Sequence, residues 1–180
     1  MKNPKDTRVL LILEDDPEQM ELLTSLALNE IQTLVDDKDT HVDHKQQLGE
    51  IQVIKVSDIY SLKKAARAYP QTILALLDCN TPSTMNGAPH DQFVKTGYKI
   101  TGQHTAVDII RKYLPETPIT TISVMLRFQR IVTRYYQEEH QFDVNFISKN
   151  EQETISRNIG HYLRQHLATL NGESYRVLDS

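Results

Sequence analysis

Charged and hydroxyl side chains follow several short apolar runs of this sequence, at the point where each run ends. They are Glu14, Asp15 and Asp16 after the first run, Asp78 after the third, Ser123 at the end of the fourth and Lys149 just after the fifth. Carboxylates that are brought together repel one another, and either protonation or a divalent cation relieves the repulsion. Mg2+ prefers oxygen ligands and keeps positions for water and phosphate oxygens. If the fold gathers these residues, they favour a magnesium-assisted phosphoryl-transfer site.

The apolar runs that precede these residues are candidate strands of a wound α/β sheet. They lie at residues 9–13, 51–56, 73–77, 119–123 and 142–147, and longer amphipathic stretches alternate with them. The first and third runs are nearly continuous in Val, Ile, Leu and Ala, which is typical of central parallel strands. The fifth run alternates apolar and polar residues, as an edge strand does. In such a sheet ligands bind where the carboxyl ends of the strands meet, so all the residues above are expected at one end.

Helices are predicted between and after these strands. The first begins with Asp16 as cap, Pro17 at the first helical position and Gln19 at capping-box spacing. The last is predicted to repeat this arrangement, with Asn150 as cap and Glu153 three positions on. The intermediate helices are predicted at residues 59–68, 103–113 and 127–139.

Two stretches, residues 36–50 and 83–101, interrupt this alternation, and we interpret both as insertions or long loops. The first carries several possible metal ligands: Asp36, Asp37, Asp39, His41, Asp43 and His44. We interpret them as a solvated acidic loop rather than a metal site, because no predicted helix or strand fixes their spacing. The second starts five residues after Asp78 and contains apolar residues such as Phe93 and Tyr98. It either folds over the edge of the acidic pocket, presents a partner-binding surface, or is a passive surface loop.

The composition is typical of one soluble globular domain, expected over residues 1–170 with a tail at 171–180. The chain has 180 residues, of which 39% are hydrophobic and 24% charged, and no apolar stretch is long enough for a membrane helix. A cytoplasmic location is therefore expected. The formal net charge of -4 gives no general reason to bind nucleic acid. We therefore expect no direct DNA binding and no membrane contact.

Two further features have alternative interpretations. Cys79, the single cysteine, could sense redox changes beside Asp78, but burial near carboxylates would raise its pKa, and we interpret it as a packing residue. The stretch at 127–139 combines Phe and Tyr with three Arg residues, which could stack on nucleic-acid bases. A helix with one buried stripe and a basic outer face is the simpler interpretation.

Four segments resemble the signature segments of response-regulator receiver domains. They are LILEDDPEQ, LLDCNTP, PITTIS and FISKN, and the resemblance runs from Val9 to about Leu170 apart from the two insertions. It includes a phosphoacceptor Asp followed four residues later by Pro, here Asp78 and Pro82. The resemblance implies a doubly wound five-stranded parallel sheet with the flavodoxin-like strand order 2-1-3-4-5.

The resemblance also implies a role for each matched residue. Asp78 corresponds to the phosphoacceptor, and Mg2+ would be held by Glu14, Asp15, Asp78 and the backbone carbonyl of Asn80, whereas Asp16 is a helix cap. Ser123 corresponds to the hydroxyl residue that turns toward the phosphoryl group, Lys149 to the active-site lysine, and Phe146 to the aromatic switch residue. The chain departs from the family at Val124, where a small residue is usual, and at Asn150, where proline is usual. The larger Val124 is expected to narrow access to Asp78.

The expected function is that of a stand-alone response regulator. A sensor histidine kinase or histidine phosphotransfer protein would phosphorylate Asp78 with Mg2+, and output would pass through altered contacts with a downstream protein or through a phosphorelay. The chain is not expected to be an enzyme, although a receiver assists its own phosphoryl transfer and hydrolysis. The alternative is a receiver-like protein-interaction module without phosphorylation. A phosphatase with an aspartyl-phosphate intermediate fits less well, because such enzymes usually carry a second Asp where this chain has Asn80.

Overall fold

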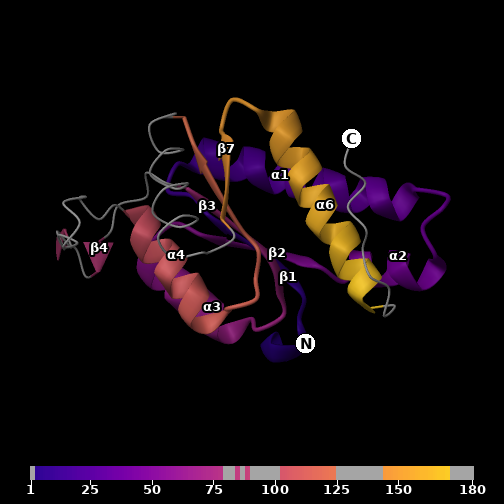
Figure 1. The fold of residues 1–180 in the computed structure, drawn as a ribbon, viewed down its shortest axis with the longest axis horizontal. Coiled ribbons are helices and arrows are strands. Elements are labelled where there is room, and N and C mark those ends of the chain that lie inside the picture. The colour runs from indigo at the N-terminus through magenta and orange to yellow at the C-terminus, as the bar shows by residue number, and fades with distance from the viewer. Residues whose placement is uncertain (1–2, 79–83, 86–87, 90–101, 125–143, 171–180) are drawn as a thin grey trace.

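The computed structural model describes residues 3–78, 84–85, 88–89, 102–124 and 144–170, and its centre is a five-stranded parallel sheet (Figure 1). The strands, in spatial order, are β2 (Gln52–Val56), β1 (Val9–Leu13), β3 (Thr72–Asp78), β6 (Ile119–Ser123) and β7 (Val144–Ser148). Counted along the chain, this is the order 2-1-3-4-5, so the predicted fold class is confirmed. The β7 strand lies at one edge, as its alternating sequence indicated.

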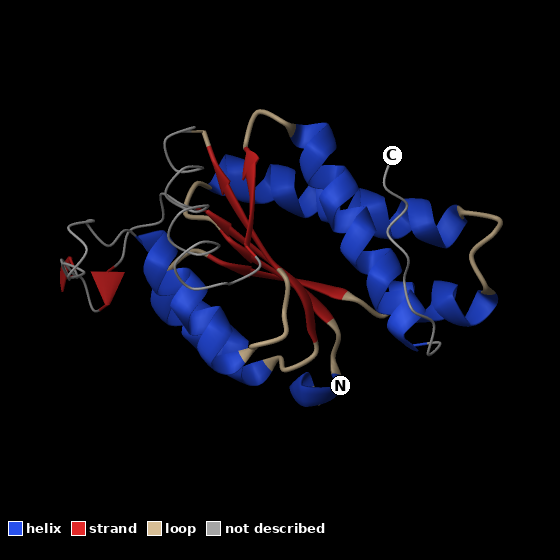
Figure 2. Ribbon diagram, in the orientation of Figure 1, coloured by secondary structure: helices blue, strands red, loops and turns tan. Residues whose placement is uncertain are grey.

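Helices cover both faces of the sheet (Figure 2). The helices α1 (Pro17–Asp36), α2 (Val42–Gly49) and α6 (Gln152–Leu170) lie on one side, and α3 (Ile59–Ala68) and α4 (Gly102–Tyr113) lie on the other. The chain begins with a short 3-10 helix at Pro4–Asp6. In the part of the chain that the structure describes, no helix is both long and apolar enough to cross a membrane.

The central strands build a core on each side of the sheet because successive side chains point to opposite faces. In β1, Leu10 and Ile12 join the core beneath α1 and α6, while Leu11 and Leu13 join the core beneath α3 and α4. Every residue of β1 and β3 is buried. Burying one such side chain contributes roughly 1.5–3 kcal/mol, so these two strands form a rigid base for the residues at their ends.

The start of α1 is as predicted and the start of α6 is not. Asp16 caps α1, because its side chain accepts hydrogen bonds from the backbone N–H groups of Glu18 and Gln19. The α6 helix begins at Gln152 rather than beside Asn150. The Glu151 carbonyl accepts the first helical hydrogen bond, from Ile155, so the cap position belongs to Glu151. The tight turn after β7 therefore takes one residue more than the capping-box pattern indicated.

Both predicted insertions contain regular structure. Residues 42–49 form the α2 helix, so the expectation of a loop across 36–50 is wrong there. This helix packs one buried side chain, Leu48, against the core beneath α1. Within 83–101, Thr84–Met85 pairs antiparallel with Ala88–Pro89 as strands β4 and β5, and β4 lies beside α3. The rest of that segment, the predicted helix at 127–139 and the tail at 171–180 lie outside the described residues.

Candidate functional site

The register of the sheet brings the carboxyl ends of its strands into line. Leu13, the last residue of β1, lies beside Leu77, and Asp78 follows as the last residue of β3. At the other side of β3, Ser123 ends β6 directly beside Ser148, which ends β7. The Lys149 N–H then donates to the Ser123 carbonyl at 2.9 Å, which fixes where the lysine leaves the sheet.

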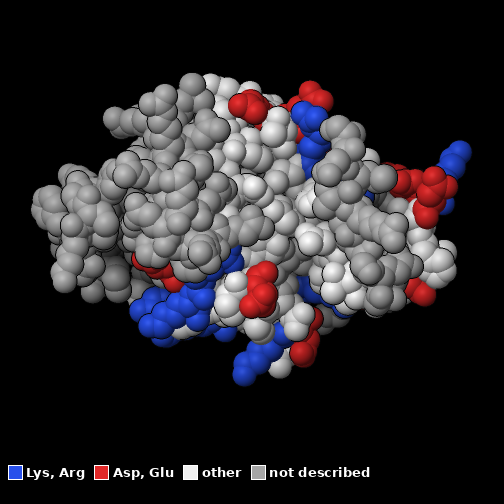
Figure 3. All heavy atoms as spheres, in the orientation of Figure 1, with Lys and Arg blue, Asp and Glu red and all other residues white. Residues whose placement is uncertain are grey.

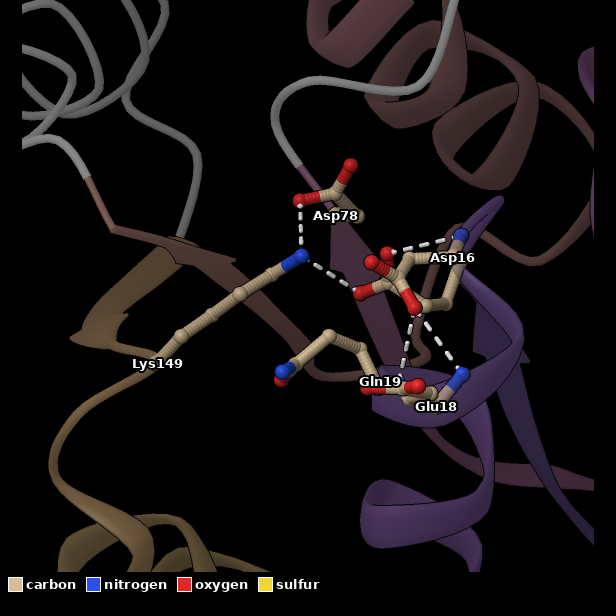
Figure 4. A network of polar contacts seen from close by, with 6 residues as sticks. Asp16, Glu18, Gln19, Asp78 and Lys149 are labelled. Carbon is tan, nitrogen blue, oxygen red and sulfur yellow. Dashed lines mark hydrogen bonds and ion pairs between the residues drawn. The ribbon is translucent and has the colours of Figure 1, made fainter.

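The centre of the site is an ammonium group between two buried carboxylates (Figure 4). Lys149 Nζ lies 2.6 Å from Glu14 Oε2 and 2.9 Å from Asp78 Oδ1. Both acidic side chains are completely buried, and the lysine side chain is 10% exposed. Three chain segments far apart in sequence therefore meet at one buried point.

Burial governs the electrostatics of this trio. Burial raises the pKa of Glu14; the hydrogen bond from Lys149 opposes this shift, and the negative charge of Asp78 adds to it. Burial of Lys149 favours its neutral amine, but its hydrogen bonds to Glu14 and Asp78, together with their charges, outweigh burial and raise its pKa. The lysine is therefore firmly cationic and compensates part of the negative charge.

A third carboxylate, Asp15, completes a group suited to a metal ion. One ligand oxygen each from Glu14, Asp15 and Asp78 lies within 4.8 Å of the others, and Asp15 is exposed to solvent. Three carboxylates against one ammonium leave an excess of negative charge, which a divalent cation can neutralise. Because Mg2+ takes carboxylate oxygens and fills its other positions with water or phosphate oxygens, these residues fit it. The carbonyl of Asn80, also predicted as a ligand, lies outside the described residues.

Asp16 has the separate role that was expected of it. Besides capping α1 with its side chain, its backbone N–H donates to Glu14 Oε1 at 3.3 Å. One Glu14 oxygen is thus held by the start of α1 and the other by Lys149, which orients the carboxylate (Figure 4).

Ser123 and Phe146, the hydroxyl and aromatic residues predicted to respond to phosphorylation, lie on the neighbouring strands β6 and β7. Ser123 is fully buried at the end of β6, and the following Val124 is 52% exposed. Phe146, two strands away from Asp78, is partly buried and packs against the core beneath α3 and α4. Its strand partner is Thr121, two residues before Ser123, so the two positions belong to adjacent strands near the same end.

Sequence reasoning missed a polar network that joins α6 to β6 and β7. Thr120 Oγ1 donates to Asn158 Oδ1, and Asn145 Nδ2 donates to the Tyr162 hydroxyl, both at 2.7 Å. The signal was present, since Thr and Asn occupy strand positions and Asn and Tyr occupy the facing helix at one-turn spacing. Because these bonds fix α6 against β6 and β7, they also support the strand that leads to Lys149.

Apart from Glu14, Asp15 and Asp78, the residues that the structure describes form no group that could hold a metal ion. The acidic and histidine residues at 36–44 form contacts in pairs and no such group: His41 Nδ1 lies 3.6 Å from Asp43 Oδ2, and the ring centres of His41 and His44 are 6.0 Å apart. Asp36 ends α1, and His41 caps α2. Their interpretation as solvated residues holds, although helices rather than a loop carry several of them.

Comparisons with known proteins bear on the fold. No protein-family model and no curated protein matches the chain. Among solved structures, it is similar to a provisionally assigned pilus assembly protein, CpaE, from Burkholderia thailandensis, with a TM-score of 0.51 at 10% identity over 88% of this chain and 99% of that one. It is also similar to an adenylate cyclase from Rhodopirellula baltica, with a TM-score of 0.51 at 14% identity over 92% and 93% of the two chains.

A third similar structure is that of a redox sensor. It belongs to a family of streptococcal redox sensors that evolved from two-component response regulators, and it matches with a TM-score of 0.51 at 17% identity. The match covers 96% of this chain and 58% of that one. Together with the strand order, these similarities give the chain a receiver-like fold.

Proposed function

We propose that the chain is a phosphoacceptor receiver in which Asp78 takes a phosphoryl group from a phosphohistidine of a sensor kinase or phosphotransfer protein. The observation that carries this proposal is the buried contact of Lys149 with both Glu14 and Asp78, beside the solvent-accessible Asp15. A buried carboxylate, an ammonium and a cation-binding acidic group are the parts that phosphoryl transfer to a carboxylate needs.

The chemistry follows from the roles of the side chains. A carboxylate oxygen of Asp78 forms a bond to phosphorus while the bond from phosphorus to the donor nitrogen breaks, and the electron pair stays on the donor imidazole. Lys149 neutralises negative charge on the phosphoryl oxygens, and the Ser123 hydroxyl can donate to one of them. When bound by Glu14, Asp15 and Asp78, Mg2+ would supply a further positive charge to those oxygens.

Signalling would then follow from how Lys149 and Ser123 respond. A phosphoryl group on Asp78 competes for the ammonium that now contacts Glu14 and Asp78. Movement of Ser123 toward this group would free space for Phe146 and change the surface around β7. A downstream protein that distinguishes the two surfaces, or onward transfer in a phosphorelay, would supply the output. The chain itself would act on no separate substrate.

A second candidate, a receiver-like interaction module without phosphorylation, is favoured by one observation. Lys149 contacts both buried carboxylates, and an ammonium between two carboxylates can stabilise the fold without any phosphoryl chemistry. The receiver-like fold does not separate the two candidates, since one fold can carry several functions.

Phosphorylation by a small donor separates them. The protein is incubated with acetyl phosphate and Mg2+, and its intact mass is measured. We expect a gain of one phosphoryl group that is lost in Asp78→Asn and in the presence of a chelator. Asp16→Asn is the matched control, because it removes a neighbouring carboxylate while asparagine keeps the helix cap. If the mass never changes, the interaction module is the correct function. If Asp78→Asn gains as much as the unaltered protein, another residue accepts the phosphoryl group and the assignment of Asp78 is wrong.

A further inference from the structure

A group of basic side chains covers the outer surfaces of α3 and α4, away from the acidic pocket. The α3 helix carries Lys63, Lys64 and Arg67 and no acidic residue. The last turn of α4 carries Arg111 and Lys112, and the exposed Asp108 lies one turn before them. Figure 3 shows Lys and Arg side chains gathered at the lower left of the molecule, where these two helices lie in Figure 1. The formal net charge of the whole chain is -4, so the positive charge of this face is opposite in sign to the net charge of the chain.

Cationic side chains from both helices lie against Tyr113, the last residue of α4. Arg67 Nη2 donates to the Tyr113 hydroxyl at 2.8 Å, and its guanidinium lies 4.7 Å from the centre of the tyrosine ring. Lys112 Nζ lies 5.7 Å from the same ring centre. The hydrogen bond from Arg67 lowers the pKa of Tyr113, and the charges of Arg67, Lys112 and Lys63 add to this effect. The hydroxyl is therefore surrounded by positive charge from two helices.

These cations form no ion pair in the described part of the chain, although Lys64 attracts the Asp58 carboxylate at the start of α3. Instead, Lys64, Arg67 and Lys112 lie against tyrosine rings, and the charge of Lys63 acts on the Tyr113 hydroxyl. Lys64, for example, lies 4.3 Å from the ring centre of Tyr60. Arg111 differs, because it donates to the carbonyls of Pro115 and Thr117 and so holds the turn after α4. Two tyrosine rings on these helices thus have cations against them, and no ion pair in the described part of the chain neutralises those cations.

From this arrangement, we propose that the α3–α4 face, defined by Lys63, Lys64, Arg67, Lys112 and Tyr113, binds an acidic peptide segment of a partner protein. The spacing favours an extended peptide. Lys63 and Arg67 are one helical turn apart, about 5–6 Å between their β-carbons. Alternate residues of an extended chain point to the same side and are about 6.6 Å apart. Acidic residues at every second position can therefore meet successive cations.

Other anionic partners fit this face less well. Proteins that bind nucleic acid through a surface patch generally have a basic domain, whereas this chain is acidic overall. Binding to an anionic membrane takes a larger basic cluster or apolar side chains that enter the lipid. On α3 and α4 the exposed large hydrophobic residue is Tyr60, which already stacks with Lys64. The site differs from the acidic pocket, so it does not depend on phosphorylation of Asp78.

The test uses a short fluorescent peptide that alternates glutamate and serine, and measures its anisotropy on titration with the full chain. We expect saturable binding that weakens as salt is added. Replacing Lys63, Arg67 and Lys112 together with alanine should weaken binding about ten-fold, since each exposed charge pair contributes a modest amount. The triple variant Lys5→Ala, Lys38→Ala and Lys45→Ala is the control. It removes the same charge from elsewhere on the surface and should bind like the unaltered chain.

Three further measurements complete the test. Tyr113→Phe keeps the ring but removes the hydroxyl, and should weaken binding by a smaller factor than the triple alanine variant. A peptide with glutamine in place of glutamate should not bind. If the two triple variants lose the same amount of affinity for the acidic peptide, binding depends on net charge alone and the proposal is overturned. Binding of phosphatidylserine vesicles or single-stranded DNA at this face, without binding of the acidic peptide, would overturn the choice of partner.

Discussion

Replacing Lys149 with methionine removes the ammonium from between Glu14 and Asp78 while keeping an unbranched side chain. At the observed distances of 2.6 and 2.9 Å, each attraction is about 6 kcal/mol for an effective dielectric constant of about 20. The energy needed to desolvate the charges offsets much of this. Removing one partner of a buried ion pair generally costs about 3–5 kcal/mol, because the remaining charge is left buried without compensation. We expect Lys149→Met to lose about that much stability at neutral pH without metal.

The stability that Lys149→Met loses should depend on pH, and the titration of Glu14 determines the direction of this dependence. Its pKa in the folded protein is raised above the ordinary value of 4.5, so the folded state binds this proton more readily than the unfolded state. Stability from this group is therefore present below the ordinary pKa and is lost as pH rises through the folded pKa. Without Lys149 the folded pKa moves higher still. The deficit of the variant should be smallest in acid and should grow as pH rises.

Urea unfolding in the presence of a chelator, followed by circular dichroism at several pH values, measures the deficit. Lys38→Met, at an exposed position, is the control and should change stability by less than about 0.5 kcal/mol. Adding Glu14→Gln to Lys149→Met removes the like-charge repulsion and should restore part of the stability at neutral pH. If Lys149→Met is as stable as the unaltered protein at neutral pH, Lys149 does not compensate the buried carboxylates and this electrostatic reasoning is wrong.

Substitutions at three other positions test how the scaffold is held together. Asp16→Ala removes the α1 cap and should cost about 1 kcal/mol of unfolding free energy, whereas Asp16→Asn should cost little; equal losses would exclude a capping role. Leu76→Ala empties a fully buried position in β3 and should cost about 2–5 kcal/mol in urea unfolding; a loss below about 1 kcal/mol would contradict its place in the core. Burial and the nearby Arg8 lower the pKa of His166 below 6.5, so stability should fall as pH drops below that value. The melting temperature of His166→Gln should fall less over the same acid range, and an unchanged pH profile would show that this histidine does not titrate with unfolding.

Much of the fold was predictable because its strands and several helices have strong local patterns. The runs at 9–13 and 119–123 and the helix at 59–68 have the predicted bounds. Central strands are predictable because continuous burial demands continuous apolar sequence. The α2 helix was missed because its sequence VDHKQQLG supplies a single buried side chain, Leu48, and no apolar stripe. Its position depends on packing against α1, which no local pattern reveals.

The candidate site was partly predictable for a different reason. Glu14, Asp78 and Lys149 follow strands whose carboxyl ends must meet in a parallel sheet, so the sequence was enough to expect them together. The contact of Lys149 with both Glu14 and Asp78 depends on side-chain geometry, and no local sequence pattern predicts that geometry. The basic face of α3 and α4 was also missed. The absence of acidic residues from the α3 sequence IYSLKKAARA was its one visible signal.

The most direct test of the central claim is to locate the phosphoryl group after reaction with a phosphodonor and Mg2+. Borohydride reduces an aspartyl phosphate to homoserine, and peptide mass spectrometry then identifies the altered residue. The account predicts homoserine at position 78, formed with the phosphodonor and absent without it. Homoserine at another aspartate, or none at position 78 in protein that has gained a phosphoryl group, would contradict it.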